Sequence, residues 1–167
     1  QTVALTLNGI TADNMQQRIG DANFSDVQWW AEWYTDTGAT ASNATITVTY
    51  NDGTTGTLNT VAVGGTVRVG RMIPLNQLIP AAASGKYIRS IDSVQLSAST
   101  ATVGNFGFTC TRPRLTMPLL LANKMEIFDW AQLGFPEIFN SSCLTIIELC
   151  STTSTGTVRG GGKVIHG

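Results

Sequence analysis

Apolar and polar side chains alternate through the stretch from Asn43 to Val63. Apolar residues stand at every second position from Ala44 to Tyr50 and are separated by threonines, which is the two-residue period of a half-buried strand. Asn51-Asp52-Gly53 follows, and Asp and Gly tolerate the positive backbone angles of a tight turn. An extended run then resumes from Thr57 to Val63. The pattern predicts a β-hairpin with one apolar face and one threonine face.

Similar alternation predicts that much of the remaining chain is extended. Ile88 and Ile91 break the strand period that Val94 follows, so we expect a bulge near Ser90. Pro113 stops the run that holds Phe106, Phe108 and Cys110 on one face, which is typical of an edge strand or of a crossing between sheets. The further predicted strands are Gln1–Leu7, Thr66–Ile73, Tyr87–Ser97, Asn105–Thr111, Ser142–Cys150 and Thr157–His166.

Helical patterns are scarce in this sequence. Asn123 to Leu133 has an N-cap residue, an apolar stripe and a closing Gly134, which together predict one short helix, and Asp13 to Ile19 fits a single helical turn. About eight to ten short strands with frequent turns are typical of a sandwich or jelly roll. We therefore expect an all-β fold over residues 1–167, a single β-sandwich or jelly-roll-like domain with one short helix.

Aromatic residues gather just before the hairpin, at Phe24, Trp29, Trp30, Trp33 and Tyr34. The simpler interpretation is a core strand whose rings fill the domain. Adjacent residues of a strand face opposite sides, so either Trp29 or Trp30 points away from the main core. We therefore take Trp29, Trp30, Trp33 and Tyr34 as candidate interface residues, for a subunit contact or for a sugar-stacking platform.

Charge is low throughout the chain. Charged residues are 13% of the 167 residues, about half the usual share, and the formal net charge is -1. A surface made polar by uncharged Thr, Ser, Asn and Gly fits an extracellular or assembled protein whose faces meet other protein. A nucleic-acid partner is not expected, because no basic excess is available to displace counterions from phosphate. Seven of the ten basic residues are arginine, which is favoured in protein contacts.

Metal, disulfide and membrane signals are weak. The cysteines form no CxxC pair and the only histidine is His166, so we expect no metal site and no cofactor. Free, reduced and largely buried thiols are expected at Cys110, Cys143 and Cys150. The apolar run Leu115–Ala122 is too short to span a membrane, so no membrane partner is expected. Since the chain starts without Met and without a signal peptide, we expect residues upstream of Gln1 to be missing from it.

No catalytic constellation is visible, so an enzyme is not expected. His166 lies at the C-terminal end, where positioning is poor, and no nucleophile, nucleotide-binding or metalloprotease motif occurs. A glycosidase would need Glu32 paired with Asp26 or Asp36 across a cleft.

One acid stands in an otherwise apolar predicted strand. Glu148, if it points inward, requires an arginine partner or protonation. Arg112 and Arg114 are the candidate partners, in the same chain or across an interface, and both join the candidate interface residues.

Several segments resemble virion structural proteins of tailed bacteriophages. The likeness covers roughly residues 43 to 167 and consists of turn and strand patterns without a reactive motif. Residues 1 to 42 show no such likeness. The segments are Gly70–Leu75, Ser93–Gly107, Leu133–Pro136 with Ser142–Leu144, and Cys150–Gly156.

Among such proteins the chain looks most like a head decoration, or cement, protein. The resemblance implies a homodimer or homotrimer that binds the major capsid protein or another virion protein and clamps the lattice by many weak contacts. It also implies a place in the virion, assembled in the host cytoplasm, and an arm before Gln1 would be the part that reaches the capsid floor. The alternatives are a tail, neck or fibre-base component of the phage, or a carbohydrate-binding β-sandwich module.

Overall fold

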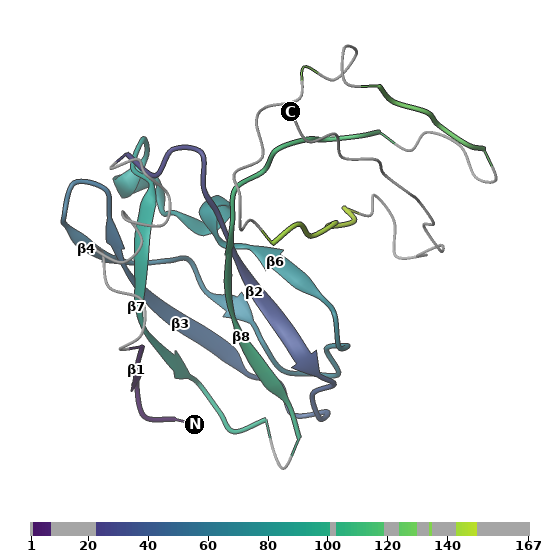
Figure 1. Ribbon diagram of the computed structural model, residues 1–167. Helices are drawn as coiled ribbons and strands as arrows, with labels where there is room; N and C mark the ends of the chain where they lie inside the picture. Colours follow the sequence, from purple (N-terminus) through teal and green to yellow (C-terminus); the bar gives the residue numbers. More distant parts are fainter. Residues whose placement is uncertain are drawn as a thin grey trace. The chain divides into compact units, whose positions relative to one another are not determined.

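The computed structural model of the chain describes residues 2–7, 23–100, 103–118, 124–129, 134 and 143–149. The chain divides into two compact units, Gln1–Ile127 and Phe128–Gly167, which are considered separately. The described residues of the first unit hold eight strands in two antiparallel sheets (Figure 1). The all-β prediction is therefore confirmed, whereas the sandwich or jelly-roll architecture stays a prediction.

The larger sheet has five strands in the order β1-β7-β3-β4, and β5 also pairs with β3. β3 pairs with β7 over most of its length, while β4 and β5 pair with different ends of its other edge. The strands are β1 (Leu5–Thr6), β3 (Asn43–Tyr50), β4 (Thr55–Thr57), β5 (Val61–Ala62) and β7 (Ile88–Leu96).

The smaller sheet has β2 (Gln28–Thr35) at its centre, between β6 (Met72–Pro74) and β8 (Asn105–Thr111) (Figure 1). The start of β2 is fixed by Asn76 in the 3-10 turn η1 (Leu75–Leu78). The Asn76 Oδ1 accepts a hydrogen bond from the Trp29 backbone N–H at 2.9 Å, and its Nδ2 donates to the Val27 carbonyl at 2.8 Å. A second 3-10 turn, η2 (Ala81–Ala83), precedes β7.

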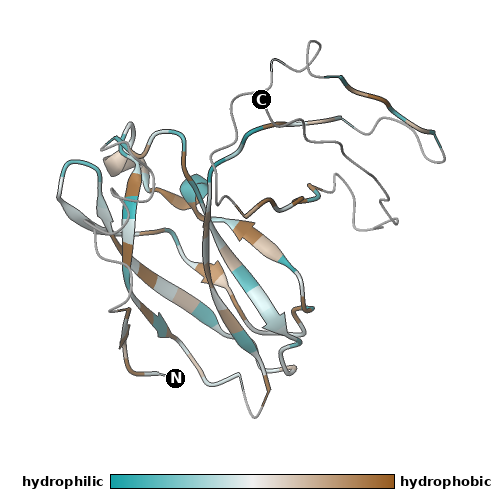
Figure 2. Ribbon diagram, viewed as in Figure 1, coloured by the Kyte–Doolittle hydropathy of each residue, from teal (hydrophilic) through white to brown (hydrophobic). Residues whose placement is uncertain are grey.

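In β3, the apolar residues of the alternating sequence are buried and the threonines between them are not. Ala44, Ile46, Val48 and Tyr50 are at most 2% exposed, and the threonines between them lie on the opposite face. Figure 2 shows apolar positions alternating with paler ones along this strand. The predicted hairpin is confirmed at its turn, where Gly53 has φ +82° and the Gly53 N–H donates to the Tyr50 carbonyl.

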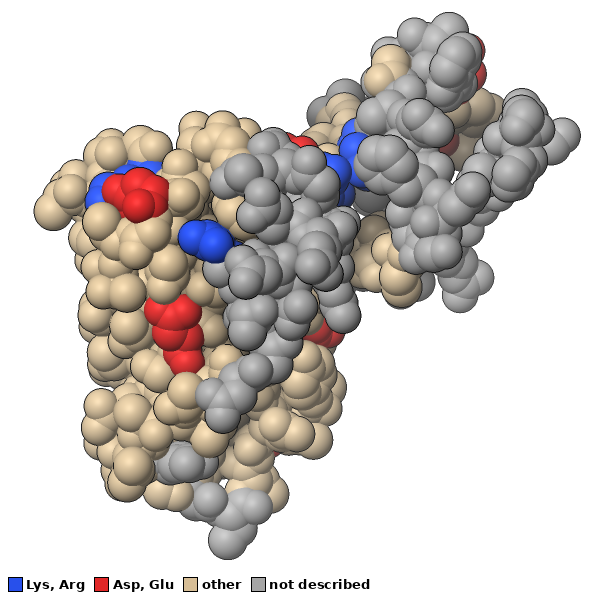
Figure 3. All heavy atoms as spheres, turned by 60° about the vertical axis from the view of Figure 1, so that its left-hand side comes forward, with Lys and Arg blue, Asp and Glu red and all other residues tan. Residues whose placement is uncertain are grey.

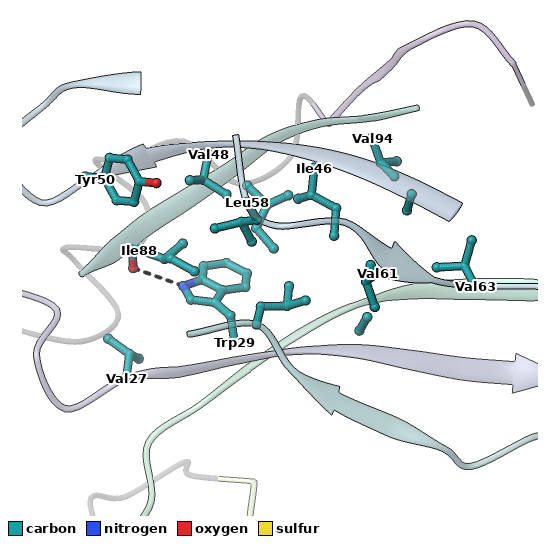
Figure 4. Packing of buried hydrophobic residues seen from close by; sticks show 14 of the residues in the cluster. Val27, Trp29, Ile46, Val48, Tyr50, Leu58, Val61, Val63, Ile88 and Val94 are labelled. Atoms are coloured by element: carbon teal, nitrogen blue, oxygen red, sulfur yellow. Dashed lines mark hydrogen bonds between the residues drawn. The ribbon is translucent and has the colours of Figure 1, made fainter. Parts of the chain in front are cut away.

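One hydrophobic cluster contains side chains from both sheets. Figure 4 shows Trp29 from β2 pointing toward Val48, Ile88 and other residues of the five-stranded sheet. Ile88, Ile91 and Val94 of β7 are all buried although their spacing breaks the strand period. The register of β7 against β3 skips Arg89 and Asp92, which is the irregularity expected near Ser90.

Several predicted elements are shorter than expected or absent. The first strand covers Leu5–Thr6 only, which pair with Val94 and Ser93 of β7, and Val3 and Leu5 are exposed. The return arm of the hairpin is split into β4 and β5, since Leu58 turns into the core between them. The Thr66–Ile73 strand is extended only in its last residues, within β6.

The predicted helix and the predicted strand after it are wrong in their described parts. Residues 124–129 of the predicted helix Asn123–Leu133 are not helical, and residues 143–149 of Ser142–Cys150 are not a strand. An apolar stripe stabilises a short helix only when it packs on a core, and Met125 and Ile127 are 81% and 73% exposed. The helical turn at Asp13–Ile19 and the strand at Thr157–His166 lie outside the described residues.

Candidate functional site

β2 positions most of the predicted site residues, and its two faces have different roles. Trp29 and Trp33 point into the shared core and are 0% and 1% exposed. The Trp29 Nε1–H donates to the Ile88 carbonyl at 3.1 Å, and the Trp33 Nε1–H donates to the Val63 carbonyl at 3.3 Å. Each indole thus buries its ring and satisfies its polar atom on the five-stranded side. These two tryptophans hold the sheets together and are not surface residues.

Trp30 and Tyr34 lie on the other face of β2, as the alternation predicted. Trp30 is outside the core cluster but only 6% exposed, and its Nε1–H donates to Thr111 Oγ1 on β8 at 2.7 Å. Tyr34 is 47% exposed, and its ring lies against Gly107, where an added Cβ would stand 2.9 Å from the ring. Among the four aromatic candidates, Tyr34 alone offers an open ring.

The acids proposed for a glycosidase are engaged separately. Glu32 Oε2 accepts a hydrogen bond from Thr109 Oγ1 at 2.6 Å, and Asp36 binds both Arg68 and the Val69 backbone N–H. These two donors hold the pKa of Asp36 below its usual range. Glu32 lies within β2, whereas Asp26 precedes the strand and pairs with Arg112, and Asp36 follows it. Each acid is therefore bound to a different group, and no carboxylate pair of the kind that a glycosidase would need is seen among them.

Arg112 has a partner other than the predicted acid. Arg112 Nε lies 2.6 Å from Asp26 Oδ2, an ion pair whose N–H is not aligned for a hydrogen bond. Arg114 is half-buried, and Glu148 is exposed. Because Glu148 faces solvent, it has no need of an arginine partner, and the condition on which that pairing depended is not met.

The thiols differ in environment. Cys110 is half-buried on β8, and desolvation, with a smaller contribution from the Asp26 charge, raises its pKa to about 12. Cys143 is free but exposed, so the prediction of largely buried thiols is wrong for this residue. Cys150 and His166 lie outside the described residues. Within the described part of the chain, no cluster of His, Cys, Asp and Glu could hold a metal ion, and no helix is long and apolar enough to cross a membrane.

A group of exposed apolar side chains was missed from the sequence. They are Met125, Ile127, Leu144, Ile146 and Leu149, between 58% and 84% exposed. The available signal was that residues 144 to 149 carry apolar side chains on both faces of an extended segment. A segment with two apolar faces needs a cover on each side, which a single sheet face does not supply. We call Lys124–Asp129 and Cys143–Leu149 the apolar C-terminal stretches, although they also hold the charged residues Lys124, Glu126, Asp129 and Glu148.

Charged groups are sparse on the face drawn in Figure 3, where Lys, Arg, Asp and Glu form a few small, separated groups. No protein family, curated protein or solved structure matches the chain.

Proposed function

We propose that this chain is a structural protein of a tailed-bacteriophage virion, most like a decoration protein that binds the outer capsid lattice and stabilises the head. The exposure of the apolar C-terminal stretches carries this proposal. In Cys143–Leu149, the side chains of Leu144, Ile146 and Leu149 are 58%, 84% and 73% exposed. Apolar side chains concentrated in short exposed stretches are typical of surfaces that another protein covers.

The low charge supports an assembly role in the same way. Desolvation of charged side chains opposes association, so charged residues are depleted at the centres of interfaces. With 13% charged residues, the chain has wide areas of uncharged surface on which weak contacts can form. Repeated over a symmetric lattice, such contacts add up to strong attachment through multivalency. The partner we propose is the major capsid protein, and the resemblance of the segments within residues 43–167 is what directs the proposal to a virion.

The burial of the tryptophans counts against a carbohydrate-binding module. Such a module would stack sugars on solvent-exposed, coplanar indoles. Trp29, Trp30 and Trp33 are at most 6% exposed, so they cannot form the platform for which they were candidates.

Immunogold labelling of particles from a lysate of the producing cells, with antibody to this chain, tests the proposal. We expect gold distributed over whole heads. Gold confined to one vertex or to the tail would contradict the decoration role and assign the chain to the neck, tail or fibre base. A lysate whose particles carry no gold would overturn the virion role altogether.

A further inference from the structure

The edge strands of the two sheets differ in length. Among the described residues, β1, β4, β5 and β6 have two or three residues each, whereas β8 has seven. Short edge strands present too few unpaired backbone groups to recruit another strand. β8 pairs with β2 on one side, and no described residue pairs with its other side. Every second residue of β8 therefore directs its N–H and C=O toward an edge that no described residue covers.

β8 also lacks the devices by which proteins protect an edge. From Asn105 to Thr111 it has no charged residue and no proline. β7 makes the contrast clear. The N-terminal segment pairs with it at Ser93 and Val94, and the Leu7 N–H donates to the Asp92 carbonyl, while the residues that its register with β3 skips are the charged Arg89 and Asp92. Bulges and charges obstruct pairing at an edge. The β8 edge has neither along its free side in the described structure.

Apolar surface accompanies the open backbone. Phe106, Phe108 and Cys110 pack against the shared core but are only partly buried. No residue of β8 is fully buried, whereas Trp29, Trp30, Ala31 and Trp33 of the neighbouring β2 all are. A further strand at this edge would cover the remaining apolar surface of β8 while pairing its backbone groups.

We infer that β8 pairs with β8 of a second copy, antiparallel across a two-fold axis at Phe108. This register pairs all seven residues and sets Phe108 against Phe108 of the second copy. Phe106 then lies opposite Cys110 of the second copy, so the apolar faces of both strands stay on the core side. The two three-stranded sheets become one sheet in the order β6-β2-β8-β8-β2-β6.

A second copy fits this edge better than an unrelated strand. Because β8 is uncharged, its self-pairing brings no like charges into opposition, which would otherwise destabilise the pair. An isologous contact needs one surface that is complementary to itself. β8 meets that condition because its backbone groups can pair with those of a second β8, its apolar faces align, and it carries no charge. On the outer face, this register pairs Gly107 with Thr109 of the second copy. The Tyr34 ring, which lies over Gly107, then lies beside that threonine and is less exposed than in the single chain.

This inference goes beyond the proposed function and does not depend on it, because the pairing is a property of the isolated chain. The test combines sedimentation-equilibrium masses with hydrogen exchange of the full chain over a range of concentrations. We expect a dimer at high concentration and concentration-dependent protection of amides in residues 105–111. Thr109→Lys should raise the dimer Kd severalfold, since the two added side chains lie diagonally across the two-fold and Glu32 of each chain balances only part of each new charge.

Thr45→Lys is the matched control, because Thr45 is exposed on β3, whose two edges are already paired. It should leave the dimer unchanged. If Thr109→Lys lowers the melting temperature too far to be informative, Asn105→Lys places the charge at the exposed end of β8 and should weaken the dimer less. A chain that is monomeric at all concentrations would overturn the inference. So would a dimer insensitive to both β8 variants, or β8 amides protected equally at every dilution.

Discussion

The strands of the β body, residues 23–111, and the apolar C-terminal stretches use similar residues with opposite results. In β3, Ile46 and Val48 are at most 1% exposed, whereas Ile146 in the second unit is 84% exposed. The difference lies in what faces each side chain. Ile46 and Val48 pack in one cluster with Trp29 and its neighbours from the other sheet, whereas Ile146 is left largely exposed to solvent. Apolar residues stabilise a fold only when a complementary surface removes them from water.

The largest effect should separate the core from the exposed stretches. Trp33→Ala removes a fully buried indole and its hydrogen bond to Val63, so we expect a loss of about 3–5 kcal/mol in the free energy of unfolding. Ile146→Ala should change it by less than about 0.5 kcal/mol. Denaturant titration measures both, and equal losses would break the comparison.

The thiols provide a chemical version of the same contrast. At pH 8, iodoacetamide should alkylate the exposed Cys143 on the order of a hundredfold faster than Cys110, because burial raises the pKa of Cys110 to about 12 and leaves little thiolate. Peptide mapping by mass spectrometry follows each site, with urea-unfolded protein as the control in which the rates converge. Comparable rates in the folded protein would contradict the burial of Cys110.

The Cys110 pKa also predicts a pH dependence of stability. An unfolded thiol ionises near pH 8.5, at about its ordinary pKa, whereas the folded Cys110 stays protonated up to about pH 12. Between these values the unfolded state binds fewer protons, so stability falls as pH rises. Unfolding curves from pH 7 to 10 should show this fall, and Cys110→Ala should make it shallower. If the stability of the variant falls with pH as steeply as that of the unmodified chain, Cys110 is not the group responsible for the fall.

Two glycines of the β body differ in what surrounds them. A Cβ on Gly64 would lie 2.5 Å from the Thr40 carbonyl oxygen and 2.8 Å from the Ser42 nitrogen, which cannot move without disturbing the turn. Gly64→Ala should therefore lose about 1–3 kcal/mol. Gly107→Ala is the control, because there the Cβ meets the end of the exposed Tyr34 side chain, which can rotate away. A thermal-melt comparison in which Gly107→Ala is the worse variant would refute this reasoning.

A charge in the C-terminal stretch should separate assembly from stability. Ile146→Asp should leave the melting temperature unchanged yet weaken binding to particles that lack this protein by about tenfold, since it buries a charge in the proposed contact. Co-sedimentation with such particles measures the binding. Thr145→Asp adds the same charge at the neighbouring exposed residue and should have a smaller effect. Equal binding by the Ile146→Asp variant and the unmodified chain would exclude this stretch from the contact.

The smallest effect is expected at the hairpin turn. Lys86 Nζ lies 2.8 Å from Asp52 Oδ2, donates to Thr54 Oγ1 at 2.7 Å and stands over the Tyr50 ring. The Lys86 ammonium and the Thr54 donors hold the pKa of Asp52 well below its usual range, so its contribution is present above about pH 4 and is lost as pH falls below that. Lys86→Met should lower the melting temperature slightly at pH 7 and less at pH 3. A larger loss of melting temperature at pH 3 than at pH 7 would contradict a stabilising ion pair between Lys86 and Asp52.

Prediction from sequence succeeded where the relevant interactions are local. The alternation in Asn43–Tyr50, the Asn51-Asp52-Gly53 turn and the bulge in β7 all depend on residues within a few positions of one another. The opposite orientations of Trp29 and Trp30 follow from strand geometry alone. The Asn123–Leu133 helix failed because its pattern described an amphipathic element without showing that a core would meet it.

The sequence by itself determined the fold class, the low charge and the opposite orientations of Trp29 and Trp30 on β2. Only the tertiary structure decided which surfaces are covered, because burial depends on segments far apart in the chain. Trp29 meets Ile88, Arg112 meets Asp26, and Leu144 and Ile146 meet solvent. The period of the sequence determines the face of the strand on which a side chain stands. Whether that face is buried depends on which other segment packs against it.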